Sequence, residues 1–418
     1  MERSYNSYVA DRFQCASLLQ SLVMKRLLPL FLISLFLNAC MAQQVVRSGN
    51  LQTGASQMSE YLPMMKSKSI GVVANPTSVI NSVHLVDTLL KSGVNVKAVF
   101  GPEHGFRGTA ADGETVKSGI DAKTGLKVIS LYGDHKKPLK SDLEGINLVV
   151  FDIQDVGTRF YTYISTLQYV MEACAENKIP LLVLDRPNPH GFYIDGPVLD
   201  TAYRSFVGMN PIPVVHGLTM AEYALMLNGE KWLKNSVQCE LYYIKMKGWD
   251  HNTFYELPVR PSPNLPNTAA IMLYPSLCFF EGTPISIGRG TEYPFQCIGY
   301  EGNKEGDFEF TPQSIPGVAK NPPQENKLCK GYLLNDFGNN VAVRGGKLYL
   351  NWLLQVYQSY PDTSKFFTPY FEKLSGTKTL REQIKLGWTE EQIRNSWGPE
   401  LEKYRLMRKK YLLYRDFE

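Results

Sequence analysis

The sequence predicts an α/β protein, in which a Rossmann-like open parallel sheet is followed by a smaller α+β C-terminal domain. Short, continuous runs of apolar residues recur along the first part of the chain, and stretches with helical spacing separate them. Such runs are typical of strands buried on both faces, and strands separated by helices indicate parallel βαβ units. After Thr291 this alternation ends and mostly helical spacing follows.

The alternating elements begin at residue 69. The first apolar run ends at Asn75-Pro76, and a helix is expected over residues 83–91, where Gly93 marks its end. The further elements are expected strands at 96–100, 128–131, 148–151 and 180–184 and a helix over 161–176. No G-x-G-x-x-G sequence follows any of these strands, so dinucleotide binding has no support and we expect no cofactor.

The C-terminal part has a different composition. Residues 301–330 are rich in Gly, Pro, Asn and Lys and predict a long loop. Helical spacing returns over residues 348–360, 379–384, 389–396 and 400–414, with Pro399 near a helix start. The expected organisation is a leader over 1–42, a linker over 43–68, a Rossmann-like catalytic domain over 69–270 and an auxiliary domain over 271–418 that closes a cleft.

The start of the chain predicts export. Met24-Lys25-Arg26 precedes an apolar run from Leu27 to Leu37, a pattern typical of a secretory signal peptide and too short to span a bilayer. The end of this segment, Leu37-Asn38-Ala39-Cys40, resembles a bacterial lipobox in which Cys40 becomes lipidated. Plain cleavage after Ala42 is the alternative. We therefore expect a periplasmic protein or a lipoprotein anchored in the outer membrane.

Composition excludes several classes of protein. Hydrophobic residues make up 44% of the 418 residues and charged residues 20%, which excludes wholesale disorder. The formal net charge of +4 gives no basic footprint for nucleic acid, so no nucleic-acid partner is expected. No C-x-x-C or H-E-x-x-H sequence occurs, and no metal site is expected. Aromatic residues make up 12%, and some of these rings could stack on a ring-shaped ligand.

Polar side chains stand directly after several of the predicted strands. In open α/β sheets, sites form beyond the carboxyl ends of the strands, so these side chains are expected on one rim of the sheet. The candidates are Asn75, Glu103, His104, Tyr132, Asp152, Gln154, Asp155, Arg159, Asp185, Arg186, Asn188, His190 and His216. Each could instead be structural; Asn75 could cap a helix and His190 could be a turn residue. Their recurrence at successive strand ends favours a binding site on this rim.

The densest of these segments is the loop over residues 101–108. Its three Gly and one Pro predict a tight, exposed turn. Glu103 is the best candidate acid or base there, because His104 and Arg107 could tune its protonation. Glu114, on a second Gly-bearing loop, supplies another carboxylate, unless it is merely a solvated loop residue. Paired carboxylates are what glycoside hydrolysis requires.

Six motifs in a fixed order point to a family. They are GPEHGFRG (101–108), FDIQDVGTRFYTY (151–163), LDRPNPHG (184–191), VHGL (215–218), PSPNLP (261–266) and FEGTPISIGRGT (280–291). From about residue 69 to the C-terminus, the chain resembles the exo-β-N-acetylmuramidase NamZ family, also known as the DUF1343 proteins. The resemblance implies a secreted hydrolase that removes terminal β-linked N-acetylmuramic acid from the non-reducing end of peptidoglycan fragments. It also implies a site in a cleft between a Rossmann-like domain and a smaller C-terminal domain.

The resemblance implies that Glu103 is the catalytic glutamate, and Glu114 is proposed as its partner. The partner could also be Asp152 or the substrate's own 2-acetamido group, and sequence spacing leaves this choice open. Tyr163, in the second motif, is a further candidate for substrate binding.

The substrate class adds a requirement for a cation. N-acetylmuramic acid carries a lactyl carboxylate, and Arg159, Arg186 or Arg289 could bind it through a bidentate pair.

Three rival functions remain open at this stage. A noncatalytic lipoprotein could bind cell-wall fragments without turnover. A Rossmann-like enzyme could act on a nucleotide or phosphorylated substrate, although the Gly-rich phosphate cradle is missing. An amidase would release peptide instead of sugar.

Overall fold

The computed structural model describes residues 50–107, 118–342 and 346–418. The predicted leader, the lipobox at Cys40 and Glu114 lie outside these residues. Within the described ranges, no helix has both the length and the apolar character needed to cross a membrane.

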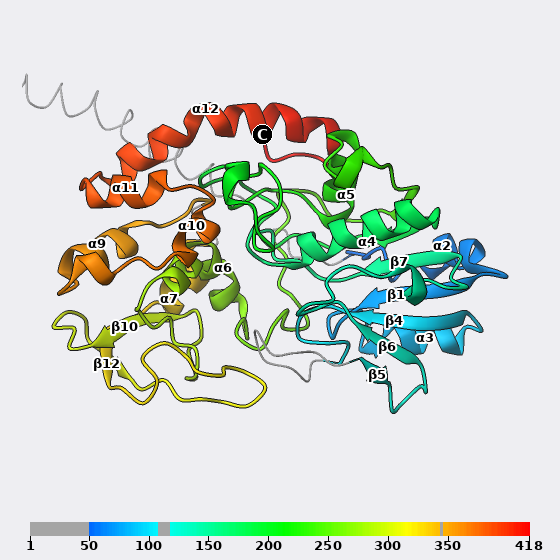
Figure 1. Cartoon of the computed structure of the whole chain (residues 1–418), viewed down its shortest axis with the longest axis horizontal. Helices are drawn as coiled ribbons and strands as arrows, with labels where there is room; N and C mark the ends of the chain where they lie inside the picture. The colour runs from blue at the N-terminus through cyan, green and yellow to red at the C-terminus, as the bar shows by residue number, and fades with distance from the viewer. Residues whose placement is uncertain (1–49, 108–117, 343–345) are drawn as a thin grey trace, which may run out of the picture. The chain divides into compact units, whose positions relative to one another are not determined.

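A seven-stranded sheet forms the larger part of the fold. Its strands, in spatial order, are β5 (Gly119–Ile120), β6 (Lys127–Ser130), β4 (Asn95–Gly101), β1 (Ser69–Ala74), β7 (Leu148–Asp152), β8 (Leu181–Leu184) and β9 (Leu241–Ile244). All neighbouring strands pair in parallel except β5, which is antiparallel to β6. Figure 1 shows β7, β1, β4 and β6 lying side by side in this order. The mainly parallel sheet confirms the predicted fold class.

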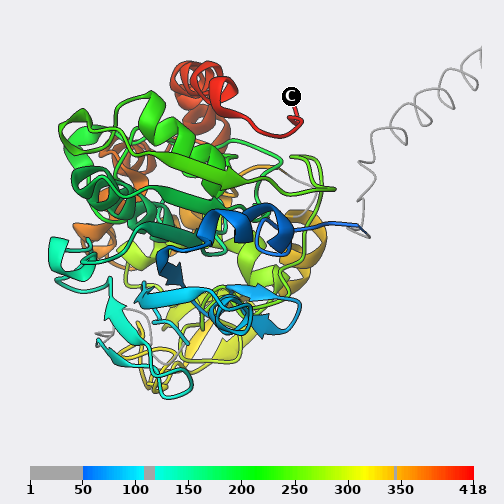
Figure 2. The same cartoon turned by 90° about the vertical axis from the view of Figure 1, so that its right-hand side faces the viewer.

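Helices cover both faces of this sheet. Successive residues of a strand point to opposite faces, so Val72 and Val150 pack in one core while Val73 and Phe151 pack in another. The first core includes residues of α2 (Met58–Met65) and α3 (Leu85–Lys91), and the second includes residues of α4 (Tyr163–Asn177) and α5 (Met220–Gly229). Figure 2 shows α2, in blue, in front of the strands. Burial on both faces explains why the strands lack polar alternation.

The C-terminal part combines helices with a small antiparallel sheet. Its strands, in spatial order, are β10 (Cys297–Glu301), β12 (Cys329–Leu333) and β11 (Phe308–Phe310). Its helices are α6 (Thr268–Leu277), α7 (Asn335–Phe337), α9 (Asn351–Ser359), α10 (Tyr370–Ser375), α11 (Thr379–Lys385) and α12 (Glu390–Arg408). A short hairpin of β2 (Val79–Ile80) and β3 (Val83–His84) follows β1. In Figure 1, β10 and β12 lie on the opposite side from β1, β4 and β6.

Two sequence predictions need correction here. The expected linker over residues 43–68 contains helix α2 in its described part, and the Tyr61 and Met65 side chains of α2 are buried. The expected loop over 301–330 contains strand β11, which forms because Phe310 packs against Cys297 and Cys329 in a small core of its own. Both segments therefore belong to the folded structure.

A third correction concerns the last helices. Residues 389–396 and 400–414 were expected to form separate helices, yet α12 runs through Pro399 from Glu390 to Arg408. Proline removes one backbone hydrogen bond. The buried face continues across it through Trp397, Leu401 and Tyr404, and this packing outweighs the local cost.

Candidate active site

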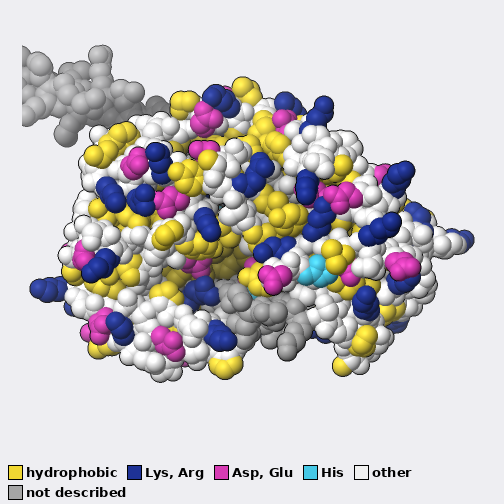
Figure 3. Space-filling view, in the orientation of Figure 1, with side chains coloured by type: hydrophobic (Ala, Val, Ile, Leu, Met, Phe, Trp, Pro, Cys, Tyr) yellow, Lys and Arg dark blue, Asp and Glu magenta, His cyan; other side chains and the backbone are white. Residues whose placement is uncertain are grey.

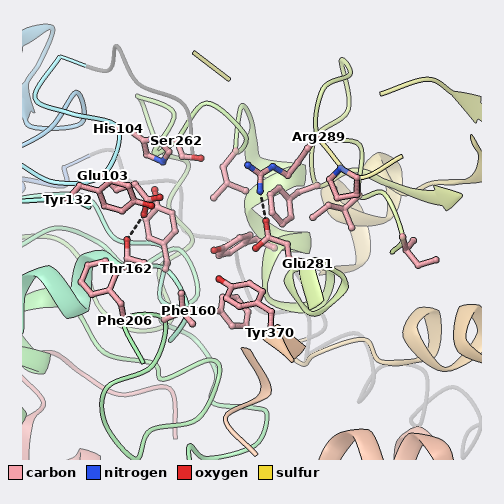
Figure 4. A pocket seen from close by; sticks show the side chains of 18 residues that line it. Glu103, His104, Tyr132, Phe160, Thr162, Phe206, Ser262, Glu281, Arg289 and Tyr370 are labelled. Atoms are coloured by element: carbon pink, nitrogen blue, oxygen red, sulfur yellow. Dashed lines mark hydrogen bonds and ion pairs between the residues drawn. The ribbon is translucent and has the colours of Figure 1, made fainter. Parts of the chain in front are cut away.

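A cavity of about 370 Å³ lies where the large sheet meets the C-terminal part. On the sheet side, residues that follow β4 and β6 and residues that precede α4 line the cavity. On the other side, it is lined by residues of the 3₁₀ helix η4 (Cys278–Gly282), by the loop that follows η4 and by the start of α10. Figure 3 shows this face of the molecule hollowed near its centre. Figure 4 shows the side chains around the cavity.

Glu103 stands on the sheet side of the cavity. It follows the end of β4 by two residues, and the chain turns sharply after it because His104 and Gly105 both have positive φ angles of 67° and 78°. Thr162 donates a hydrogen bond from Oγ1 to Oε2 of Glu103 over 2.8 Å. The Tyr163 hydroxyl lies 3.5 Å from the Glu103 backbone oxygen. The half-buried carboxyl group is therefore held in a defined orientation.

A second carboxylate, Glu281, faces the cavity from the opposite wall, where it forms an ion pair with Arg289 over 2.7 Å. Two glycines shape the loop that presents Arg289. Gly288 and Gly290 have φ angles of 79° and 81°, and a Cβ atom at either would lie 2.2 Å from a backbone oxygen. The sequence Gly-Arg-Gly is thus required by this backbone path.

Aromatic rings line the space between the two walls. The residues concerned are Tyr132, Phe160, Tyr161, Phe206, Tyr274, Phe295 and Tyr370. Partial burial, together with the nearby carboxylates of Glu281 and Glu103, raises the pKa of the Tyr370 phenol. A neutral phenol and flat ring faces suit a sugar, whose C–H groups stack on aromatic rings while its hydroxyls accept and donate hydrogen bonds.

Four predicted residues line the cavity, namely Glu103, His104, Tyr132 and Arg289. Tyr163 is not one of the lining residues, and its hydroxyl lies 3.5 Å from the backbone oxygens of both Glu103 and Pro261. Glu114, the proposed second carboxylate, lies outside the described residues. The structure therefore brings together candidates from the first and last motifs, which are about 180 residues apart in sequence.

Two predicted residues form a buried ion pair outside the cavity. Arg186 donates to both carboxylate oxygens of Asp152, over 2.5 and 2.9 Å, and the two side chains are 4% and 0% exposed. Arg186 also donates to the backbone oxygen of Val79. A bidentate pair of this kind holds strand ends together and leaves neither group facing the cavity.

Arg159 is also buried and has a structural role. Its guanidinium donates to the backbone oxygens of Pro197, Ile212, Leu374 and Ser375 over 2.7–2.9 Å. Burial lowers its pKa to about 9. These contacts tie the end of α10 to loops that follow the large sheet.

Three predicted amide residues also bond to the protein itself. Asn75 accepts from the backbone N–H of Thr77, Gln154 donates to the backbone oxygen of Pro187, and Asn188 donates to that of Leu218. All three are nearly fully buried, so they fix the turns after β1, β7 and β8.

The other two predicted histidines, His190 and His216, lie in a buried polar cluster with Asp155. His216 Nε2 is 3.8 Å from Asp155 Oδ2, and His190 bonds the backbone oxygen of Val156. Burial raises the pKa of Asp155 to about 7 and lowers those of His190 and His216 to about 4 and about 3. Burial thus favours the neutral form of each of these groups.

Asp185 and Arg107 also lie away from the cavity. The Tyr414 hydroxyl of the C-terminal tail donates to Asp185 over 2.6 Å, and burial raises the pKa of Asp185 to about 6. Arg107 pairs with Asp121 and Asp87, and these carboxylates raise the pKa of Arg107. Both side chains are therefore engaged by partners within the protein.

Sequence reasoning missed several residues of the cavity, among them Glu281, Thr162 and Tyr370. Glu281 had a detectable signal, because it lies in the last motif eight residues before Arg289. Thr162 likewise lies in the second motif, but its neighbour Tyr163 was chosen instead. Tyr370 carries no local signal, since it follows an ordinary helix start in the C-terminal part. Within the described ranges, no group of three His, Cys, Asp or Glu side chains is arranged to hold a metal ion.

A cavity with two carboxylates, a guanidinium group and a lining of aromatic rings defines a site of the glycosidase class. Two family models match this chain, the N-terminal domain of exo-beta-N-acetylmuramidase NamZ over residues 70–269 and its C-terminal domain over 272–414. The chain belongs to the exo-β-N-acetylmuramidase NamZ family. This confirms the resemblance seen in the six motifs.

Individual relatives agree with this assignment. The chain is 41% identical over 392 residues to peptidoglycan beta-N-acetylmuramidase NamZ of Bacillus subtilis strain 168, which covers 89% of this chain and 93% of that protein. Crystal structures of two DUF1343 family proteins from Bacteroides fragilis NCTC 9343 are similar to it, with TM-scores of 0.81 and 0.74 and identities of 45% and 31%. Each match covers 88% of this chain and all of the other.

Proposed function

We propose that the cavity hydrolyses the β-glycosidic bond of a terminal N-acetylmuramic acid at the non-reducing end of peptidoglycan fragments. The observation that best supports this proposal is the arrangement of charged side chains on two opposed walls of the cavity. Glu103 is oriented by Thr162 on one wall, and the Glu281–Arg289 pair stands on the other. The identity to the Bacillus subtilis β-N-acetylmuramidase supports the same substrate.

Glu103 is the general acid in this proposal. Its carboxyl group donates a proton to the glycosidic oxygen as the bond breaks, and the leaving sugar departs as an alcohol. The hydrogen bond from Thr162 positions the carboxyl group for this transfer.

The contacts of Asp152 and Glu281 bear on the choice of the second catalytic group. Asp152 is unsuited, because its carboxylate is fully buried and paired with Arg186. Glu114 stays a prediction, and the substrate's 2-acetamido group stays an alternative. Glu281 joins them as a carboxylate that lines the cavity itself.

Arg289 is the proposed partner of the lactyl carboxylate. Of the three arginines considered from the sequence, Arg159 and Arg186 are buried and bonded to protein oxygens. Arg289 lines the cavity, and a guanidinium can bind a ligand carboxylate through two parallel hydrogen bonds.

The test uses a disaccharide of N-acetylmuramic acid linked to N-acetylglucosamine, with N-acetylmuramic acid at the non-reducing end. We expect the protein to release free N-acetylmuramic acid, identified by mass, and Glu103→Gln to lower kcat by roughly 10²–10⁴-fold with unchanged folding. Glu60→Gln is the matched control, because Glu60 in α2 is exposed and does not line the cavity. Binding without release by the unmodified protein would favour the noncatalytic cell-wall-binding alternative.

Export is a separate part of the proposal. The basic start, the apolar run and Cys40 support secretion with a lipid anchor at Cys40. Expression of the full chain with Cys40→Ser should shift the protein from the membrane fraction to the soluble periplasmic fraction. An unchanged distribution would contradict the anchor.

A further inference from the structure

A groove beside the cavity is strongly basic. It holds about 400 Å³, and four cations, Arg204, Lys373, Lys378 and Arg381, line it together with a single carboxylate, Glu372. We refer to it as the basic groove.

Most of this positive charge is not neutralised by the protein. Glu372 pairs with Arg381 over 2.6 Å. Throughout residues 50–107, 118–342 and 346–418, no carboxylate forms an ion pair with Arg204, Lys373 or Lys378, and all three side chains are exposed. Three cations in one hollow repel each other, and an anionic ligand would relieve that repulsion.

The basic groove and the catalytic cavity share their walls. One wall of the groove contains Arg204, and the same segment continues to Phe206 and Val207, which line the cavity. The other wall contains Pro369 and Lys373, and Tyr370 between them lines the cavity. The cavity and the groove are therefore neighbours along the same two segments of the chain.

A further cation lies close to Phe206, a residue of the cavity wall. Lys136 Nζ lies 5.2 Å from the centre of the Phe206 ring. Both Lys and Arg side chains and Asp and Glu side chains border the hollow on the face shown in Figure 3. Lys136 adds a positive charge near the segment that contributes to both the groove and the cavity.

We propose that the basic groove binds the lactyl carboxylate of the second N-acetylmuramic acid in a glycan strand whose first N-acetylmuramic acid occupies the cavity. This inference rests on the proposed function. A strand without stem peptides alternates N-acetylmuramic acid with N-acetylglucosamine, so a carboxylate recurs on every second sugar. An enzyme that removes the terminal sugar leaves the next carboxylate outside the cavity, where the groove supplies complementary charge.

The experiment compares two peptide-free substrates, the disaccharide used above and the tetrasaccharide made of two such units. The measured quantity is the ratio of kcat/KM for the tetrasaccharide to kcat/KM for the disaccharide. Reversing both lysines with Lys373→Glu and Lys378→Glu should lower this ratio roughly fivefold or more. The milder pair Lys373→Gln and Lys378→Gln should give an intermediate ratio, which guards against misfolding of the reversed pair.

The matched control is Lys91→Glu with Lys127→Glu. These exposed lysines lie at the end of α3 and the start of β6, on the amino side of the strands, and their reversal changes the net charge equally. The control pair should keep the ratio of the unmodified protein. The proposal would be overturned if the ratio fell equally in the control pair and in the reversed groove pair, or if it did not fall in the groove variants.

A third substrate distinguishes binding of a lactyl carboxylate of the glycan from binding of a carboxylate of the stem peptide. If the groove variants lose efficiency only on a disaccharide that carries a stem peptide, the groove binds peptide and the glycan assignment is overturned. Failure of the proposed function is distinguishable, because the unmodified protein would then release no N-acetylmuramic acid from any substrate.

Discussion

The carboxyl rim of the large sheet has two halves that differ in character. The open half, after β4 and β6, carries Glu103, His104 and Tyr132 on the wall of the cavity. The closed half, after β1, β7 and β8, carries more polar residues, but they are buried and bond to one another or to the backbone.

The difference arises from what covers each half. The C-terminal tail closes the second half, where Tyr414 bonds Asp185 and Tyr404 of α12 donates to the backbone oxygen of His216. The open half faces η4 and the Arg289 loop, which leave a space between them. The strand-end rule therefore locates polar residues correctly, while the segment that packs against them decides whether they meet a ligand.

The largest expected effect is on stability and concerns the closed half. Asp152→Asn removes one partner of the buried pair and leaves the charge of Arg186 uncompensated. We expect a loss of about 3–5 kcal/mol in the free energy of unfolding, measured by urea denaturation. The folded fraction should keep its kcat on the disaccharide.

A double variant completes this test. Adding Arg186→Met to Asp152→Asn removes both charges and should recover part of the lost stability. A large fall in kcat for the folded single variant would instead place the ion pair in the catalytic site.

The next prediction concerns pH. Burial raises the pKa of Asp155 to about 7, whereas an aspartate in the unfolded chain has a pKa of about 3.9. Between about pH 4 and pH 7 the unfolded chain releases a proton that the folded chain keeps, so the free energy of unfolding falls as pH rises. Above this window, Asp155→Asn should therefore be more stable than the unmodified protein by about 2–4 kcal/mol.

The measurement is the difference in unfolding free energy between the two proteins across pH 4–8. His190 and His216 also have shifted pKa values, but they are present in both proteins and largely cancel in the difference. A difference that does not vary with pH would contradict the protonated state of Asp155.

A smaller effect is expected at the wall opposite the open half. Arg289→Gln removes the proposed partner of the lactyl carboxylate, and the inhibition constant of free N-acetylmuramic acid should rise roughly tenfold or more. N-acetylglucosamine lacks the lactyl group, so its inhibition constant should change much less. Because the substitution also leaves Glu281 without its partner, Glu281→Gln with Arg289→Gln serves as the control. An equal rise in the inhibition constants of both sugars would contradict the assignment of Arg289 as the partner of the lactyl carboxylate.

Much of the fold follows from the sequence because its causes are local. Apolar runs flanked by helical spacing located strands β1, β4, β6, β7 and β8 within one or two residues. The helix boundary predicted at Pro399 was wrong, because that prediction rested on the local preference of proline. Tertiary packing along Trp397, Leu401 and Tyr404 decides the length of α12 instead.

The site was less predictable, because its two walls come from distant segments. Glu103 could be predicted from its loop chemistry and its position after β4. Glu281 and Tyr370 reach the cavity only through the packing of the C-terminal part, which no local pattern encodes. Polar residues such as Arg159 and Asp185 carry the same sequence signal as ligand-binding residues, and only their buried partners reveal a structural role.

The smallest expected effect compares matched threonines in the two halves. Thr162 in the open half donates to Glu103, and Thr77 in the closed half donates to Asn75. Because Thr162 acts through Glu103, Thr162→Val should lower kcat roughly twofold to tenfold with little change in KM, and Thr162→Ser should restore it. Thr77→Val should instead lower the unfolding free energy by about 1 kcal/mol and leave kcat unchanged, since its partners only shape a turn. If both variants lowered kcat equally, the two halves of the rim would act as one site, and the distinction between them would fail.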